Sequence, residues 1–387
     1  MVMNTATVQH ILTELVGFDT VSRHSNLALL DWIERYLADH GVESQRIKSD
    51  DGSKANLLAR IGPDVEGGVV LSGHTDVVPV DGQTWHSDPF TLSAREGRLY
   101  GRGSCDMKGF IACALAMLPE WRTARLNRPI WLALSYDEEV GCLGAPRMIE
   151  QMVAHCPRPA AVIVGEPTLM QPVTRQKGIT SLRTLVRGVE AHSSQIGAGV
   201  SAIHVAARLV SHIEAIMEDL VAERCCNPAF NVAHSSLHVG RIEGGSAINI
   251  MARECTFEWE IRHLPEEGFN AVFERFESFS RQLEETLQAR HKDFAIETTL
   301  LTPTVPGLDG GGNVTAIALC EQLLGPRQPE AVAYATEAGQ FQQAGLEAII
   351  CGPGSIEQAH KPDEYISETQ LEQGLDFMHH LGKQLLE

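Results

Sequence analysis

Four short apolar segments, each followed by a polar loop, place the strongest constraint on how this chain can fold. They are residues 68–71, 130–134, 161–164 and 348–350. Continuous runs of Val, Ile, Leu and Ala bounded by turn residues are typical of strands that are buried on both faces of a sheet. Helical periodicity in residues 109–121 and 144–154 lies between them. This alternation predicts an α/β fold with a mostly parallel sheet and helices on its faces.

The pattern changes in the middle of the chain, which suggests a second domain. A length of 387 residues suits two domains at about 100–200 residues each. Between residues 179 and 292, alternating strands flank two long helices, and apolar strands of the first type lie on both sides of that stretch. We therefore predict a catalytic domain made of residues 1–178 and 293–387, interrupted by an α+β domain at 179–292.

The composition of the chain indicates which kinds of molecule the protein binds. Fifty acidic residues against 31 basic ones give a formal charge of −19, which repels nucleic-acid phosphates and anionic membranes and favours a small-molecule substrate. No window approaches the ~20 apolar residues of a membrane span, and the first residues lack a signal-peptide pattern. Nine scattered cysteines without a C-x-x-C pair indicate a reducing compartment. We expect a cytoplasmic protein that binds neither nucleic acid nor membrane.

Potential metal ligands follow the apolar segments at the point where each predicted strand ends. Open α/β sheets place their active sites at these carboxyl ends, where successive loops meet. A further acidic residue lies in a glycine-rich loop, GRGSCDMKG, just before an apolar helix. The candidates are His74 and Asp76 after the first segment, Asp106 in the glycine-rich loop, Glu138 and Glu139 after the second segment, Glu166 after the third and His360 after the fourth.

Two imidazoles and three carboxylates at one sheet edge suit a pair of zinc ions, with one carboxylate between them. Taken singly, each residue has an ordinary alternative: a loop histidine, a surface carboxylate or a turn residue. Their shared position after successive strands favours the metal site. Asp76 would orient His74 through the second ring nitrogen. The same nitrogen and oxygen ligands also accept Co²⁺ or Mn²⁺.

Five motifs carry a resemblance to a known family: SGHTDVVP, GRGSCDMKG, YDEEVGCLGA, GEPT and GPGSIEQAHKPDEY, in this order. They resemble the M20 family of metallopeptidases and deacylases, which includes aminoacylases, succinyl-diaminopimelate desuccinylases and acetylornithine deacetylases. The resemblance covers nearly the whole chain. It implies two zinc ions per subunit, one bound by His74 and Glu166, the other by Glu139 and His360, with Asp106 bridging them.

The resemblance also implies that Glu138 is the general base. It would take a proton from a metal-bridging water that attacks the acyl carbonyl and then donate that proton to the leaving amine. The role suits a carboxylate beside a metal, because its pKa must let it accept a proton and return it. A non-catalytic metal-binding dimerisation protein is the alternative from another class, and the presence of Glu138 argues against it.

The inserted stretch resembles the family's lid and dimerisation domain, which implies a homodimer. In GVEAHSS, His192 matches a histidine that reaches a neighbouring subunit's active site, where it would stabilise the oxyanion. Asn249 and Arg262 resemble lid positions that contact the substrate, and a guanidinium can hold an α-carboxylate through two hydrogen bonds. Either residue could equally satisfy main-chain groups at a strand end.

The choice of substrate rests on weaker features. The segment YATEAGQF at 334–341 resembles the T-E-A segment of acetylornithine deacetylases rather than the T-S-D-x-R of desuccinylases. We therefore expect deacetylation of N-acetyl-L-ornithine to L-ornithine and acetate, a step of arginine biosynthesis. Succinyl-diaminopimelate and a broader range of N-acyl amino acids or dipeptides are the alternatives. Glu337 could attract a cationic amine, or could be a helix-start carboxylate with Thr336 as the cap.

Overall fold

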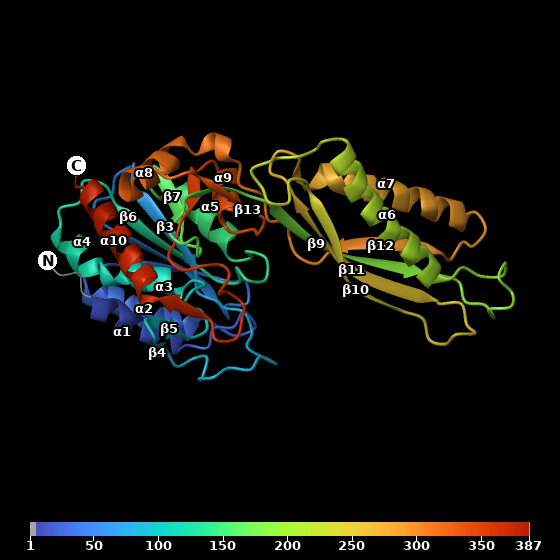
Figure 1. Ribbon diagram of the computed structural model, residues 1–387, viewed down its shortest axis with the longest axis horizontal. Helices are drawn as coiled ribbons and strands as arrows, with labels where there is room; N and C mark the ends of the chain where they lie inside the picture. Colours follow the sequence, from blue (N-terminus) through green and yellow to red (C-terminus); the bar gives the residue numbers. More distant parts are fainter. Residues whose placement is uncertain (1–4, 387) are drawn as a thin grey trace. The chain divides into compact units, whose positions relative to one another are not determined.

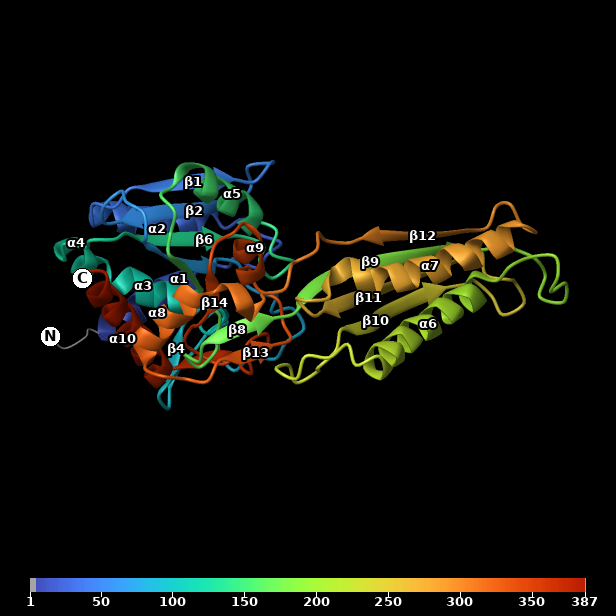
Figure 2. The same cartoon turned by 90° about the horizontal axis from the view of Figure 1, so that it is seen from above.

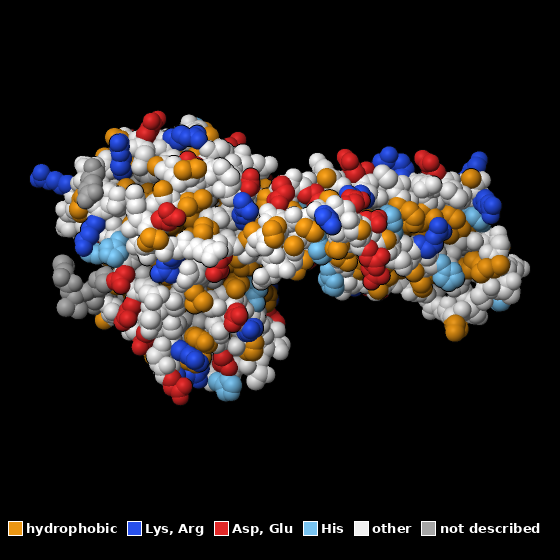
Figure 3. Space-filling model, turned by 45° about the horizontal axis from the view of Figure 1, so that its top comes forward, with side chains coloured by type: hydrophobic (Ala, Val, Ile, Leu, Met, Phe, Trp, Pro, Cys, Tyr) orange, Lys and Arg blue, Asp and Glu red, His pale blue; other side chains and the backbone are white. Residues whose placement is uncertain are grey.

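The computed structural model describes residues 5–386, and these divide into two compact units. Unit 1 comprises the described residues up to Thr174, then Leu308–Glu330, then the residues from Thr336 onward. Unit 2 comprises Arg175–Gly307 and Ala331–Ala335 (Figure 1). Within the described range, no helix is both long and apolar enough to cross a membrane. On the face drawn in Figure 3, basic and acidic side chains are interspersed over both units.

The four predicted buried strands form the centre of an eight-stranded sheet. Strands β3 and β6 pair in parallel, as do β3 and β7, and β7 and β14. All of their residues are buried. The prediction of a mostly parallel α/β sheet is confirmed for this centre, whose strands are β6 (Ile130–Ser135), β3 (Val69–His74), β7 (Ala161–Val164) and β14 (Ala348–Ile350), in this spatial order.

Antiparallel strands flank this centre on both sides. The sheet order is β1-β2-β6-β3-β7-β14-β8-β13. Strands β1 and β2 pair with each other, and β2 pairs with β6, all antiparallel. On the other side β8 pairs antiparallel with β14, and the division between the two units falls within β8 and β13. These strands are β1 (Ser44–Lys48), β2 (Ala55–Ile61), β8 (Val173–Gln176) and β13 (Glu330–Val332).

Helices cover both faces of the sheet in unit 1 (Figure 2). On one face, six helices share a continuous apolar core with alternate residues of the strands. On the other face, α5 packs on β2 and β6, and α9 packs on β7 and β14. The six helices are α1 (Thr5–Val16), α2 (Leu27–Asp39), α3 (Lys108–Ala116), α4 (Leu118–Thr123), α8 (Val314–Leu324) and α10 (Glu368–Gln384), and the two opposite are α5 (Ala145–His155) and α9 (Ala338–Gln343).

The helix expected at residues 109–121 is two helices, α3 and α4. The chain turns at Met117, and Pro119 lies in the first turn of α4. A proline has no main-chain N–H to continue the hydrogen-bond ladder, so it is accommodated at a helix start and not within a helix. A short 3₁₀ helix at Gly310–Gly312 precedes α8.

A small three-stranded sheet in unit 1 joins distant parts of the chain. Its order is β15-β5-β4, and β15 pairs with β5 so that Tyr365 lies opposite Tyr100. The pairing brings the loop that ends at β15 against the glycine-rich loop that follows β5. The strands are β4 (Ser93–Arg95), β5 (Arg98–Tyr100) and β15 (Tyr365–Ser367).

Unit 2 is an α+β unit, as predicted for the insertion. Its four strands have the order β10-β11-β9-β12 and are antiparallel. Helices α6 and α7 pack against the sheet and against each other, around a separate apolar core (Figures 1 and 2). The elements are β9 (Gly178–Arg187), α6 (Ala202–Ala222), β10 (Ser236–Gly244), β11 (Glu254–His263), α7 (Gly268–Gln288) and β12 (Ala295–Leu300).

The return to unit 1 lies further along the chain than the boundary at residue 292 that the sequence suggested. Strand β12 pairs with β9 and so belongs to the sheet of unit 2, which extends to Gly307. The exposed, mixed side chains of β12 gave no apolar run that would have assigned it to either domain.

Candidate metal centre

The parallel strands bring the candidate ligands to one edge of the sheet. His74 is the last residue of β3 and lies opposite Ser135, the last residue of β6. Glu138 and Glu139 lie in the turn that follows β6, and Glu166 follows the end of β7. Because neighbouring parallel strands end at the same edge, residues almost one hundred positions apart become neighbours.

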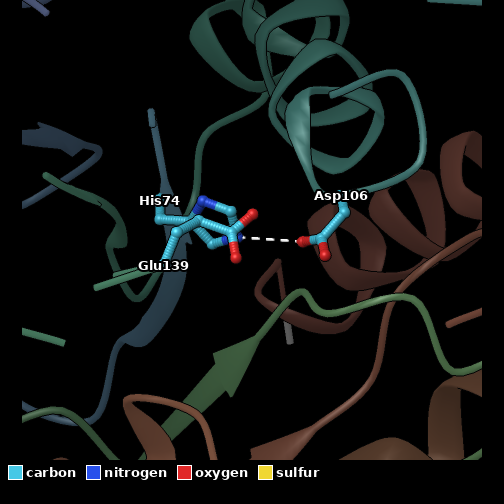
Figure 4. Close-up of side chains that lie close together, drawn as sticks. All are labelled: His74, Asp106 and Glu139. Carbon is cyan, nitrogen blue, oxygen red and sulfur yellow. Dashed lines mark hydrogen bonds and ion pairs between the residues drawn. The ribbon is translucent and has the colours of Figure 1, made fainter. Parts of the chain in front are cut away.

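Asp106 stands between the two imidazoles. His74 Nε2 lies 3.0 Å from Asp106 Oδ1, and His360 Nε2 lies 3.4 Å from Asp106 Oδ2. His360 Nε2 is also 3.0 Å from Glu139 Oε2, and His74 Nε2 is 3.8 Å from Glu166 Oε1. Figure 4 shows the His74 ring and the Asp106 carboxylate pointing toward one another, with Glu139 beside them. The structure thus brings together all five residues predicted to be ligands.

The cluster has the features of a cation site. Ligand atoms of His74, Asp106 and Glu139 lie within 4.8 Å of one another, and so do those of His74, Glu138 and Glu166. In the part of the chain that the structure describes, the Oε1 atoms of Glu139 and Glu166 are buried without a hydrogen-bond partner. Buried carboxylate oxygens without a partner are costly. Divalent cations would satisfy these oxygens, and imidazole and carboxylate ligands suit zinc and related ions.

The electrostatics of the cluster favour the binding of a cation. Burial raises the pKa values of Glu138 and Glu166 well above their usual range. Burial and the nearby Asp106 raise the pKa of Glu139 to about 7, while hydrogen bonds to Asp106 and Glu139 raise the pKa of His360 to about 10. Without a cation, these carboxylates compete for protons because their charged forms are poorly solvated. A bound divalent ion would favour all of them as anions.

Asp76 has a different set of contacts from the one we expected. The ring atom His74 Nδ1 is hydrogen-bonded to the main-chain oxygen of Asp76 at 2.9 Å, whereas the carboxylate oxygen Oδ1 is 3.8 Å away. That carboxylate instead accepts from the main-chain nitrogens of Glu138 at 3.0 Å and Glu139 at 3.2 Å. It also accepts from Ser22 Oγ at 2.7 Å. Asp76 therefore orients His74 through its carbonyl, and its carboxylate holds the turn that carries both glutamates.

Sequence reasoning missed further partners of the Glu138 turn. The thiol of Cys142 donates to Glu138 Oε1 at 3.3 Å, and Lys54 pairs with Asp137 at 2.5 Å. Asp137 and Cys142 both adopt positive φ angles, 55° and 52°. Since the left-handed region is unfavourable for side chains with a Cβ, these bonds hold a turn that the chain alone would not prefer. No sequence motif known to us predicts the thiol contact.

Glu337 is more deeply enclosed than a substrate-binding residue on an open surface. The residue is 1% exposed and immediately precedes α9, where Thr336 Oγ1 accepts from the main-chain nitrogen of Ala338 at 3.1 Å. Ser72 of β3 donates to Glu337 Oε2 at 3.0 Å. These contacts favour the helix-start interpretation over contact with a substrate amine. The negative charge of Glu337 is also one of those that raise the pKa of Glu138, after burial and Glu139.

The remaining candidates lie in unit 2 and are more exposed. His192 is exposed and its Nδ1 is 2.8 Å from Ser194 Oγ. Asn249 is also exposed, and its main-chain oxygen accepts from the nitrogen of Ser193 at 3.1 Å, so His192 and Asn249 lie on adjacent segments. Arg262 is partly buried, pairs with Glu260 at 2.8 Å and donates to the oxygen of Ala333 at 3.3 Å.

Comparison with known proteins gives the same family as the motifs. The model of peptidase family M20/M25/M40 matches residues 70–384. An acetylornithine deacetylase of Edwardsiella ictaluri is 36% identical over 349 residues, which is 89% of this chain and 87% of that protein. An acetylornithine deacetylase of Proteus mirabilis is 34% identical over 362 residues, covering 93% and 90% of the two chains.

Solved structures share the fold at low sequence identity. A tripeptidase of Staphylococcus aureus superimposes with a TM-score of 0.77 at 17% identity, covering 100% of both chains. The Bacillus subtilis YXEP protein, described as a dinuclear metal-binding peptidase, has a TM-score of 0.68 at 15% identity and covers 99% and 98%. At these identities the likeness supports the fold alone: an α/β unit with an inserted α+β unit.

Proposed function

Because the chain belongs to peptidase family M20/M25/M40 and is a metal-dependent amide hydrolase, we propose that it deacetylates N-acetyl-L-ornithine to L-ornithine and acetate. The observation that carries the chemistry is Asp106, whose two oxygens face the two imidazoles of a buried, carboxylate-rich cluster. The observation that supports the substrate is the identity of 36% over 89% of the chain to a named acetylornithine deacetylase. Arginine biosynthesis is the matching pathway.

We assign the metal ligands as follows. His74 and Glu166 would hold one zinc ion, Glu139 and His360 the other, with Asp106 between them. Two such ions, when bound, lower the pKa of an attacking water to ~7 and polarise the acyl carbonyl. The same residue types would also bind Co²⁺ or Mn²⁺.

Glu138 is the proposed general base. It lies in the turn held by Asp76, beside the cluster, and burial favours its protonated form, so the carboxylate can accept a proton. Glu138 takes a proton from the water that attacks the amide carbon. As the C–N bond of the tetrahedral intermediate breaks, the same carboxyl donates that proton to the leaving amine. A carboxylate oxygen of Glu138 lies within 4.8 Å of the ligand atoms of His74 and Glu166, which would place the base beside the ion held by those two residues.

Residues of unit 2 are proposed to complete the site. His192 would donate a hydrogen bond to the oxyanion of the intermediate in the active site of a second subunit, which requires a homodimer. Arg262 would hold the substrate α-carboxylate, and Asn249 would contact the substrate beside His192. Their exposure leaves His192 and Asn249 open to such contacts.

We also infer a reducing, cytoplasmic setting. In the described residues all nine cysteines are free thiols, and several of them are buried. A secreted protein of this kind would normally use its cysteines in disulfides. Western or activity measurements on separated cell fractions would test this inference, and a periplasmic signal would contradict it.

The substrate proposal is tested by measuring amine release from N-acetyl-L-ornithine, N-succinyl-LL-diaminopimelate and N-acetyl-methionine, each with and without a chelator. We expect a chelator-sensitive preference for acetylornithine, expressed in kcat/KM. A preference for either of the other substrates would retain the metal chemistry and overturn the ornithine assignment. If metal-loaded, folded protein released no amine from any of the three substrates, the proposed function would be wrong.

A further inference from the structure

Arg102 and Glu364 form a fully buried ion pair in unit 1. Arg102 NH1 donates to Glu364 Oε2 at 2.6 Å, and each side chain is 1% exposed. Burying two charges is expensive unless the geometry is good and other hydrogen bonds satisfy both groups. The pair joins the glycine-rich loop before α3 to the loop that leads into β15, segments far apart in the sequence.

The second oxygen of Glu364 holds the main chain at Asp106. Glu364 Oε1 accepts from the main-chain nitrogens of Cys105 at 2.9 Å and Asp106 at 3.1 Å. Hydrogen bonds to a charged acceptor contribute about 1.5–3 kcal/mol each. The carboxylate therefore fixes the main chain of Asp106, whose side chain faces both imidazoles.

The other end of the pair reaches His360. Arg102 NH2 donates to Gln83 Oε1 at 2.7 Å, and Gln83 Nε2 donates to the main-chain oxygen of His360 at 3.0 Å. Arg102 NH1 also lies 3.3 Å from the oxygen of Lys361. The His360 side chain is 54% exposed, so packing fixes this residue less than it fixes the buried ligands. Hydrogen bonds to its main chain therefore help to set its position.

We propose that these three residues, Gln83, Arg102 and Glu364, form a positioning network that sets Asp106 and His360 for the second metal ion. The proposal rests on the metal pair proposed above. Asp106 and His360 are two of the three ligands assigned to the second ion, whereas only Asp106 serves the first. Loss of the network therefore weakens the second ion more than the first. The three residues act through the main chains of Asp106 and His360, so they are positioning residues and not catalytic ones.

The test is calorimetric titration of Zn²⁺ into metal-free protein. Glu364→Gln keeps the size of the side chain but removes the charge that binds Arg102 and the two amides. We expect one of the two Zn²⁺ equivalents, the one held by Glu139 and His360, to bind about 10- to 100-fold more weakly, as is typical when groups that orient metal ligands are changed. The affinity of the other equivalent should change far less, and kcat should fall while KM stays near its original value.

A milder variant keeps the test valid if loss of the buried charge prevents folding. Gln83→Glu retains an oxygen that accepts from Arg102 but loses the donor to His360. We expect it to weaken the equivalent held by Glu139 and His360 by about fivefold, the net value of one hydrogen bond of ~1 kcal/mol. Arg147→Gln, which breaks the exposed ion pair with Asp50 in the same unit, is the matched control and should bind both equivalents normally.

The outcomes separate the inference from the function. If wild-type protein binds two equivalents and both folded variants do so with unchanged affinities, the positioning network is wrong. An equal loss at both equivalents would also contradict it. If wild-type protein binds no metal, the proposed metal pair is wrong, and so is the positioning network that depends on it.

Discussion

The two units hold their candidate residues in opposite ways. In unit 1, the side chains of His74, Asp106 and Glu166 are at most 6% exposed and are surrounded by hydrogen-bond and ion-pair partners. In unit 2, His192 and Asn249 are exposed, and the His192 ring has Ser194 as its close partner. The fold positions enclosed side chains before a substrate binds, whereas exposed side chains depend on contacts with a substrate or a second subunit. The comparison predicts that the candidates of unit 1 are held in place by the fold, whereas His192 and Asn249 of unit 2 depend on a further contact for any role in catalysis.

The largest expected effect is in unit 1. Glu138→Gln keeps the size of the side chain but cannot accept a proton, so we expect kcat to fall by about 10³-fold, within the usual range for general acid–base groups. Zinc content by atomic absorption should remain at the wild-type value. Glu150→Gln, at an exposed position on α5, is the matched control. Near-normal kcat in Glu138→Gln would remove the general-base assignment.

The next effect tests whether unit 2 takes part in chemistry at all. His192→Ala should lower kcat by about 10²-fold, because an oxyanion donor contributes ~3 kcal/mol. His204→Ala on α6, also exposed, should leave kcat unchanged. If His192 acts in a second subunit, mixed dimers of His192→Ala and Glu138→Gln chains should regain activity. If verified mixed dimers show no recovery of activity, the proposed action of His192 across subunits is wrong.

A smaller effect is expected at Arg262. Lysine retains the charge but not the two parallel donors that match a carboxylate, so Arg262→Lys should raise KM about tenfold, or ~1.4 kcal/mol, with little change in kcat. Arg183→Lys, on neighbouring β9 and paired with Glu258, is the control in the same sheet. A fall in kcat at constant KM would mean that Arg262 stabilises the transition state instead.

The smallest effect sharpens the description of unit 1. Cys142→Ala removes the thiol donor to Glu138, and we expect kcat to fall about fivefold, the value of ~1 kcal/mol for one hydrogen bond. Cys142→Ser supplies another donor and should restore most of the loss. Cys156→Ala is the control, at the end of α5. Equal activity in the alanine and serine variants would show that the thiol only fills space.

The sequence predicted the parts of the fold whose signal is local. The apolar runs predicted the central strands, because burial on both faces of a sheet leaves a continuous apolar pattern. The polar loops after these runs predicted where the candidate ligands lie. Strand β1 was not anticipated because Ile47 is its one buried residue. The sequence assigned strand β12 to the catalytic domain, whereas the strand belongs to the sheet of unit 2. Its partner β9 lies more than one hundred residues earlier in the chain, and a local pattern does not show such a pairing.

The candidate site followed the same rule. Ligand types could be identified from motifs, but their supporting contacts could not, because these join residues that are distant in the chain. Glu364 lies 258 residues from Asp106, whose main chain it holds. The carbonyl of Asp76, and not its carboxylate, meets His74 because of how the chain turns after β3. Such details depend on main-chain geometry, which residue type alone does not specify.

The most direct test of the account is anomalous diffraction at the zinc edge from crystals of the zinc-loaded protein. The account predicts two peaks per chain, about 3.5–4 Å apart as in other two-metal sites. One should lie beside His74 and Glu166, the other beside Glu139 and His360, with Asp106 touching both. A single peak, or peaks away from these residues, would contradict the two-metal centre on which the proposed chemistry depends.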